Sequence, residues 1–198
     1  MVDLMDVQGA SVLLALEDGW DATCQLSALA QLLMDPYYRT IQGFADLIDK
    51  EFSAFGHRFA HRNNLTQSDQ NNGIAPVFVQ FLDCVAQVLR QFPMSFEFNE
   101  YMLKYLAFHS MSNRFTNFLT DCESDRVDLG LIENRRSPNS PHEPDVNQWP
   151  VSCGSVWDYI ELMNRKNAKF YNFVYAAGAV DDQVCAVNNE RKIGKNIQ

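Results

Sequence analysis

A turn near the start of the chain gathers the residues best placed to do chemistry. Residues 17–21 carry three carboxylates, Glu17, Asp18 and Asp21, around a single glycine, between an apolar run and a helical pattern. A glycine-bearing turn between a buried strand and a helix is a common anion cradle, because backbone N–H groups point inward and the helix dipole adds positive charge. The carboxylates, and the absence of Lys and Arg from residues 1–38, oppose tight binding of a phosphate dianion here.

Longer motifs that composition alone does not produce stand around and beyond this turn. They include Asp-Gly-Trp-Asp at 18–21, Asp-Pro-Tyr-Tyr-Arg-Thr at 35–40, Phe-Gly-His-Arg-Phe at 55–59, Gln-Phe-Leu-Asp-Cys-Val at 80–85 and Ser-Val-Trp-Asp-Tyr at 155–159. Together they closely resemble the myotubularin family of phosphoinositide 3-phosphatases. The resemblance runs from about residue 11 to about residue 175.

Active members of that family read His-Cys-Ser-Asp-Gly-Trp-Asp-Arg-Thr at the phosphate loop. In this chain the corresponding loop spans residues 16–23 and consists of Leu16, Glu17, Asp18, Gly19, Trp20, Asp21, Ala22 and Thr23. Leu16 stands at the nucleophile position, Glu17 at the Ser position, Ala22 at the Arg position, and Ala15 at the preceding His position. The loop sequence most resembles that of the SET-binding-factor branch, whose members are taken to be pseudophosphatases.

The chemistry of these two replacements predicts that the loop is not catalytic. A cysteine phosphatase needs a thiolate to attack phosphorus and an arginine to bind the phosphoryl oxygens as charge develops. Leu16 has no lone pair, and Ala22 has no donor. Cys24 lies nearby, on the helix side of the loop, and we interpret it as a packing thiol. Asp18 and Asp21 occupy the family's general-acid positions, where we expect them to cap the helix or shape the turn.

The resemblance implies partners as well as a function. Inactive myotubularins pair with active relatives, so we expect an adaptor or regulator of an active phosphoinositide 3-phosphatase, within a larger protein. Rab GTPases would be engaged only by modules outside this chain. Such a protein is expected in the cytoplasm, peripherally on endosomal membranes. Three alternatives stay open: a non-hydrolysing phosphoinositide-binding module with weak head-group contact, residual phosphatase activity, and a partial product that does not act alone.

Other candidate sites give weaker signals. His57 and His61 lie four residues apart, as metal ligands on a helix do, but no third ligand is visible, and we expect neither a metal nor a cofactor. Four cations, Arg39, Lys50, Arg58 and Arg62, could form a basic surface for a lipid head group. Scattered charges of this kind more commonly form a solvated face.

Composition limits the remaining possibilities. The chain has 198 residues and a formal net charge of −9, which argues against nucleic acid as a partner. Its five cysteines are widely spaced and form no CxxC pair, which favours free thiols. Residues 1–6 show neither a basic segment nor a long apolar core, so we expect no signal peptide, and no stretch approaches the ~20 apolar residues of a membrane span.

The elements that must position the loop are read from periodicity. The apolar run at 11–16 predicts a strand buried on both faces, followed by the loop and a helix from Thr23 to Asp35, with an apolar face of Leu26, Leu29, Ala30 and Leu33. Further helices are predicted over 44–55, over 76–92, from an Asn99 cap to 109, from Ser112 to 119, and from a Ser155 cap to 163. Polar or proline-rich stretches at 63–73 and 134–150 predict loops.

These elements predict an α/β fold, mostly helical in this chain, with one strand–phosphate loop–helix unit. Residues 1–178 are expected to form the C-terminal half of a myotubularin-type, cysteine-phosphatase-like domain. Residues 179–198 are expected to be a flexible tail. A lone strand cannot form a sheet, so its partner strands are expected outside this chain.

Overall fold

A computed structural model of the chain describes residues 1–16, 18–63, 73–130 and 154–175. The described part is helical: α1 (Val2–Asp6), α2 (Ala22–Met34), α3 (Ile41–Ile48), α4 (Phe59–Arg62), α5 (Val77–Gln91), α6 (Glu100–His109), α7 (Glu123–Asp128) and α8 (Val156–Asn167). Short 3₁₀ turns lie at Pro36–Arg39, Pro93–Ser95 and Thr116–Phe118, and the π-helical segment η2 (Asp49–Ala54) continues α3. None of these helices is long and apolar enough to cross a membrane.

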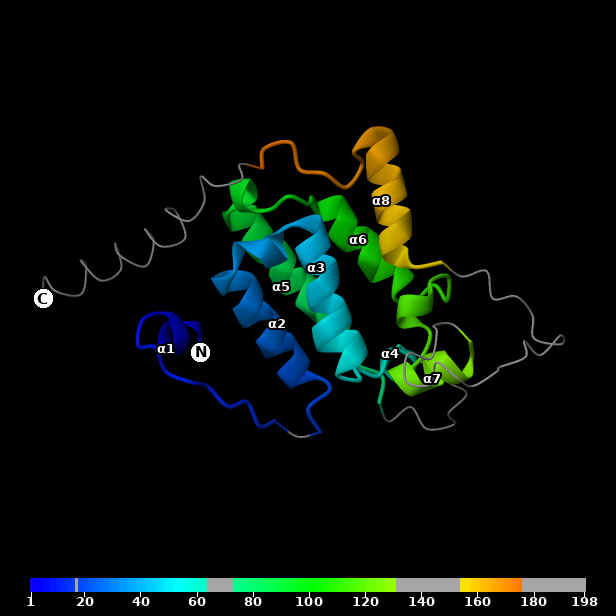
Figure 1. The fold of residues 1–198 in the computed structure, drawn as a ribbon, viewed down its shortest axis with the longest axis horizontal. Helices are drawn as coiled ribbons and strands as arrows, with labels where there is room; N and C mark the ends of the chain where they lie inside the picture. The colour runs from blue at the N-terminus through cyan, green and yellow to red at the C-terminus, as the bar shows by residue number, and fades with distance from the viewer. Residues whose placement is uncertain (17, 64–72, 131–153, 176–198) are drawn as a thin grey trace, which may run out of the picture.

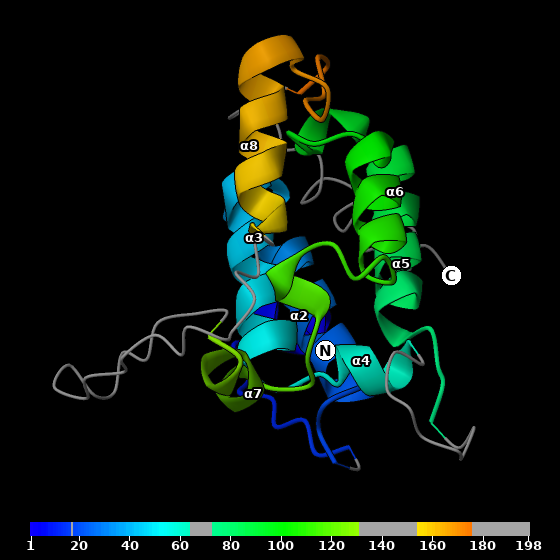
Figure 2. The same cartoon turned by 90° about the vertical axis from the view of Figure 1, so that its right-hand side faces the viewer.

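Two pairs of helices form the body of the fold. α2 and α3 lie on one side and α5 and α6 on the other, with α8 beyond α3 and the short α4 and α7 at one end (Figures 1 and 2). A chain of phenylalanines joins the two sides. Phe52 lies 4.9 Å from Phe81 and 5.2 Å from Phe78, and Phe59 lies 5.1 Å from both Phe78 and Phe118, measured between ring centroids. These rings are fully buried and belong to the hydrophobic core.

Local sequence signals set most helix boundaries. The Thr40 hydroxyl accepts from the Gly43 amide at the start of α3, Asn99 Oδ1 accepts from Met102 N at the start of α6, and Ser155 Oγ accepts from Trp157 N at the start of α8. Pro93 follows the end of α5 and prevents its continuation. The predicted helices over 23–35, 44–55, 76–92, 99–109 and 155–163 are therefore confirmed, with α8 running on to Asn167.

The predicted strand at 11–16 is wrong for this chain. These residues have no regular secondary structure, and within the described ranges the β-pairing consists of one isolated bridge between Phe98 and Tyr171. A strand is stable only when neighbouring strands accept its backbone hydrogen bonds, and no such neighbour stands beside residues 11–16 among the described residues. The strand–loop–helix unit is thus reduced to an extended segment, the loop and α2.

Two further predictions need correction. The helix expected from Ser112 to 119 is only a 3₁₀ turn at Thr116–Phe118, because Asn113 adopts a left-handed conformation with φ of 55°. Phe55, the last apolar residue of the pattern that predicted a helix over 44–55, is 65% exposed. The helix α1 was not predicted. Glu17 and most of the expected loops at 63–73 and 134–150 lie outside the described residues, as do 176–198.

Candidate functional site

The backbone of the phosphate loop turns at Gly19. Its φ of 86° is a conformation that favours glycine, and its amide donates to the Leu16 carbonyl over 3.1 Å. The Thr23 hydroxyl donates to the same carbonyl over 3.4 Å. The helix α2 then begins at Ala22, so the turn delivers the chain directly into a helix N-terminus.

The carboxylate of Asp21 is held by an arginine from α4. Arg62 Nε lies 3.1 Å from Asp21 Oδ1, and Arg62 Nη2 donates to Asp21 Oδ2, which makes the pair bidentate. Arg62 Nη1 also donates to the Gly73 carbonyl over 2.7 Å. Of the two roles expected for Asp21, capping α2 or shaping the turn, the structure contradicts the first: Asp21 occupies the N-cap position, but its side chain accepts no capping hydrogen bond.

His57 and Arg58 hold the neighbouring residue, Trp20. His57 Nδ1 lies 2.7 Å from the Trp20 carbonyl oxygen, which can only accept, so this nitrogen is the donor. Burial lowers the pKa of His57 below its usual value, and the nearby Arg62 acts in the same direction, whereas the Trp20 carbonyl and Asp21 act against it. The guanidinium of Arg58 lies 3.8 Å from the centroid of a Trp20 ring, a cation–π contact.

Residues 57–62 therefore form an anchoring segment behind the loop. Sequence analysis treated His57 as a weak metal candidate and Arg58 and Arg62 as scattered surface charge, and it missed their common role. The contacts join residues about 40 positions apart, which local periodicity does not encode. The only local signal was the Phe-Gly-His-Arg-Phe motif, which was noted for the family resemblance alone.

The thiol of Cys24 is buried where α2 meets the loop. Its Sγ lies 3.5 Å from the Gly19 carbonyl oxygen. Burial, together with the negative charges of Glu51 and Asp21, raises its pKa to about 12. At neutral pH this cysteine therefore remains a thiol, as expected for a packing residue.

The exposed residues of the loop are poorly suited to bind an anion. Asp18 and Leu16 are exposed, and Ala22 contributes only a methyl group. Within the described ranges, the guanidinium groups that contact the loop belong to Arg58 and Arg62 of the anchoring segment, and that of Arg62 is committed to Asp21. The arrangement therefore presents a shaped turn at a helix N-terminus, with Leu16 before the turn and Ala22 at the start of α2.

The remaining candidates do not assemble into a site. His57 Nδ1 is directed at the loop, whereas His61 is tied through its backbone amide to Asp121 Oδ1 over 3.0 Å. Across the described ranges, no group of three His, Cys, Asp or Glu side chains could hold a metal ion. The hypothesis of a common basic surface is wrong, since Arg39 is buried and donates to the Leu32 and Leu33 carbonyls.

Comparison with known proteins assigns the chain to a family. The family described as "Myotubularin-like phosphatase domain" matches residues 1–127. The chain belongs to the myotubularin family. Its myotubularin relatives include myotubularin-related protein 5 of Caenorhabditis elegans, 41% identical over 175 residues, which are 88% of this chain and 9% of that protein.

Other myotubularin relatives are named as phosphatases. The phosphatidylinositol-3,5-bisphosphate 3-phosphatase MTMR8 of Gallus gallus is 47% identical over 128 residues, covering 65% of this chain and 20% of that protein. The phosphatidylinositol-3-phosphate phosphatase MTMR7 of Mus musculus is 45% identical over 130 residues, covering 66% of this chain and 20% of that protein. The chain therefore spans at most about a fifth of the length of these three relatives.

Proposed function

We propose that this chain is part of a catalytically inactive myotubularin domain that regulates an active phosphoinositide 3-phosphatase as an adaptor. The observation that carries the proposal is the pair of replacements in the loop, Leu16 at the nucleophile position and Ala22 at the arginine position. Losing one preorganised donor lowers a catalytic rate by roughly 10²–10³, and losing the nucleophile closes the covalent route.

Among the residues that the structure describes, no group next to the loop supplies the missing chemistry. Cys24 is the nearest thiol in sequence, but its burial and raised pKa keep it protonated, and it contacts the Gly19 carbonyl oxygen. Arg62 cannot replace an arginine at position 22 while it is paired with Asp21. Both observations support an inactive loop.

The shape of the loop supports a role other than catalysis. Gly19 keeps its turn, and the anchoring segment fixes Trp20 and Asp21. A loop held in place by a buried histidine and a bidentate arginine presents a constant surface to other molecules. We propose that an active myotubularin relative is the partner, acting at endosomal membranes from the cytoplasm.

The experiment is co-purification of the protein carrying this sequence with active phosphatases such as the MTMR7 and MTMR8 relatives. Turnover of 3-phosphorylated phosphoinositides by each complex is compared with turnover by the phosphatase alone. We expect a stable complex in which turnover changes at least about twofold. Failure to form a complex with any candidate would reject the regulatory role.

A non-hydrolysing lipid-binding module is the second candidate, and one observation favours it. Arg58 is exposed beside the loop, where its guanidinium could approach an inositol phosphate bound at the N-terminus of α2. Titration with soluble inositol phosphates tests this idea. Binding should weaken steeply with salt, Asp18→Lys should strengthen it, and Arg58→Ala should weaken it. Absence of binding at low salt would exclude this candidate.

A further inference from the structure

The helices α6 and α8 run side by side in opposite directions, and aromatic rings join them (Figures 1 and 2). The ring of Tyr105 on α6 lies 5.6 Å from that of Tyr159 on α8, with an angle of 5° between the ring planes. Phe115 contacts Tyr159 over 6.0 Å, and Phe170 contacts Tyr105 over 5.1 Å, again between ring centroids. These contacts establish which sides of the two helices meet.

Large apolar side chains stay exposed beside these rings. On α6, Tyr101 and Phe108 lie four residues before and three residues after Tyr105, so the three share one side of the helix. On α8, Leu162 lies three residues after Tyr159 and shares its side in the same way. Tyr101 is 43%, Phe108 67% and Leu162 48% exposed. Because Tyr105 contacts Tyr159, the two sides adjoin, and together they are called the α6–α8 surface.

Three cations border the aromatic rings of this surface. Arg114 lies 5.4 Å from the centroid of the Tyr159 ring, and Lys169 lies 4.7 Å from that of the Tyr101 ring. Lys166 lies on α8, seven residues after Tyr159 and therefore on the same side of the helix. All three cations are exposed, so their N–H groups can reach the carboxylates of another molecule.

The carboxylates of α6 and α8 offset little of this positive charge. Glu100 on α6 is already paired with Arg90, and Glu161 on α8 is paired with Arg165. Asp158 is exposed and forms no ion pair within the described ranges, so it counts against one of the three cations. The α6–α8 surface thus carries an excess of positive charge on a chain whose formal net charge is −9.

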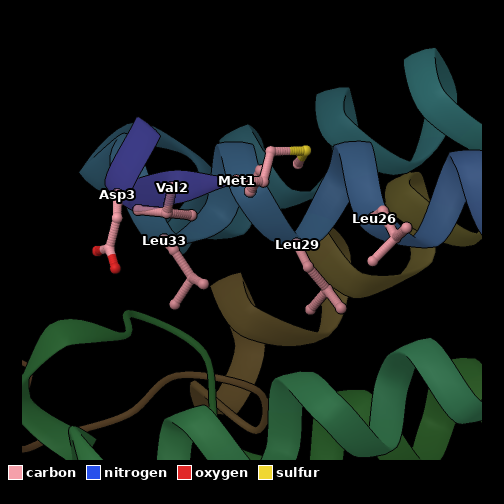
Figure 3. A pocket seen from close by; sticks show the side chains of 7 residues that line it. Met1, Val2, Asp3, Leu26, Leu29 and Leu33 are labelled. Atoms are coloured by element: carbon pink, nitrogen blue, oxygen red, sulfur yellow. The ribbon is translucent and has the colours of Figure 1, made fainter. Parts of the chain in front are cut away.

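A second exposed apolar surface, the outer face of α2, differs in charge. There Leu26, Leu29 and Leu33 stand opposite Met1 of the N-terminus (Figure 3). The residues that line this face include Asp3 and neither Lys nor Arg, so it has no cationic side chain with which to bind a carboxylate. The combination of exposed rings with unpaired cations therefore distinguishes the α6–α8 surface from the outer face of α2.

An amphipathic helix with acidic side chains suits the α6–α8 surface best. Helices that dock in this way place apolar residues at positions i, i+3 or i+4, and i+7 against apolar side chains of the partner. Tyr101, Phe108 and Leu162 offer such contacts, and acidic residues at the flanks of the helix can pair with Arg114 and Lys166. An anionic membrane is a poorer match, because its wide plane also faces the acidic remainder of the chain, whereas a helix contacts this surface alone.

We propose that the α6–α8 surface is a docking site for an acidic amphipathic helix of another protein. The site uses no residue of the phosphate loop or of the anchoring segment, so it does not depend on whether the loop is catalytic. It gives the chain a binding function that is separate from any effect on a phosphatase.

Peptide binding tests the proposal. The probe is a fluorescent helical peptide of about 21 residues, with Leu at the apolar positions of each heptad and mostly Glu elsewhere. Fluorescence anisotropy measures its binding to the protein carrying this sequence at low salt, where we expect a dissociation constant below about 100 µM. Binding should weaken at least about tenfold when Lys replaces Glu in the peptide, or when salt is raised to about 0.5 M.

Two exposed leucines supply a matched pair of variants. Leu162→Glu places a carboxylate within the α6–α8 surface and should weaken binding of the acidic peptide at least about tenfold. Leu129→Glu makes the same change at a residue that follows α7 and is 52% exposed, and the dissociation constant should stay within about twofold. Circular dichroism establishes that both variants are folded. Lys166→Glu alters an exposed side chain, should also weaken binding, and tests the surface if Leu162→Glu does not fold.

Three results would overturn the proposal. The first is an absence of peptide binding at low salt. The second is an equal loss of binding in Leu162→Glu and Leu129→Glu, which would show that binding follows the net charge of the chain and not this surface. The third is binding to phosphatidylserine vesicles that Leu162→Glu abolishes, without binding to the peptide, which would assign the surface to a membrane.

Discussion

Residues 11–16 and the helix α2 flank the same turn, and both are rich in apolar residues, yet their surroundings differ. After the turn, Cys24, Ala28 and Leu32 are buried, and the anchoring segment holds Trp20 and Asp21 from behind. Before the turn, Leu13 and Leu16 are exposed. An apolar pattern therefore indicates which residues are suited to burial. Which of them are buried in this chain depends on the elements that pack against them.

The strongest test of that comparison lies within α2 itself. Leu32→Ala removes a fully buried side chain and should lower the free energy of unfolding by about 2–5 kcal/mol. Leu26→Ala makes the same chemical change on the outer face and should cost less than about 1 kcal/mol. Urea unfolding followed by circular dichroism measures both. Similar losses at the two positions would mean that the outer face is already packed.

The anchoring of the loop gives the second prediction. Arg62→Ala leaves the partly buried Asp21 carboxylate without its bidentate partner and should cost about 1–3 kcal/mol of unfolding free energy. Arg90→Ala is the matched control, because Arg90 pairs with Glu100 on the exposed surface, where solvent screens the pair and its loss should change stability far less than the loss of Arg62. If the two variants unfold at the same urea concentration, the Arg62–Asp21 pair does not anchor the loop.

The pH dependence of stability should report the burial of His57. Its pKa is lowered in the folded protein, so between the folded and unfolded pKa values the unfolded state binds more protons. Stability contributed by neutral His57 is therefore complete above about pH 6.5 and declines as the pH falls below it. Urea unfolding at pH 7.5, 6.5 and 5.5 should show this decline, and His57→Gln should flatten it. If the unfolding free energy of His57→Gln depends on pH as steeply as that of the unchanged protein, the pH dependence arises at another group, for example His109, whose pKa is also lowered by burial.

The smallest change in stability is expected for a substitution in residues 11–16, before the turn. Leu13→Ser should change the unfolding free energy of the chain by no more than about 0.5 kcal/mol, because the leucine is almost wholly exposed. Amide hydrogen exchange on the same sample should be fast at residues 12–16 and slow across the buried face of α2. Slow exchange at residues 12–16 would show that the segment already has a pairing partner.

Local signals predicted the parts of the fold that local contacts determine. The caps at Asn99 and Ser155, and the apolar period of α5, predicted helices that the structure confirms. The strand at 11–16 failed because its stability depends on neighbours that no local pattern supplies. The expected helix after Ser112 failed at the left-handed Asn113, which periodicity does not reveal.

In the candidate site, too, the sequence predicted the locally determined features but not the long-range contact. The position of the loop before α2 followed from the glycine turn and from the family motif. The pairing of Arg62 with Asp21 could not be predicted from local sequence, because it joins α4 to the loop across 41 residues. The replacements Leu16 and Ala22 were visible at once, because a nucleophile and an arginine are defined by residue type.

Phosphate release from lipid vesicles measures directly whether the loop is catalytically inactive. The purified protein carrying this sequence is incubated without a partner on vesicles containing phosphatidylinositol 3-phosphate or 3,5-bisphosphate, and free phosphate is measured over time. We expect no release above the protein-free control, because the loop has neither a nucleophile at position 16 nor an arginine at position 22. Release in proportion to protein concentration, unchanged through repeated purification, would contradict it.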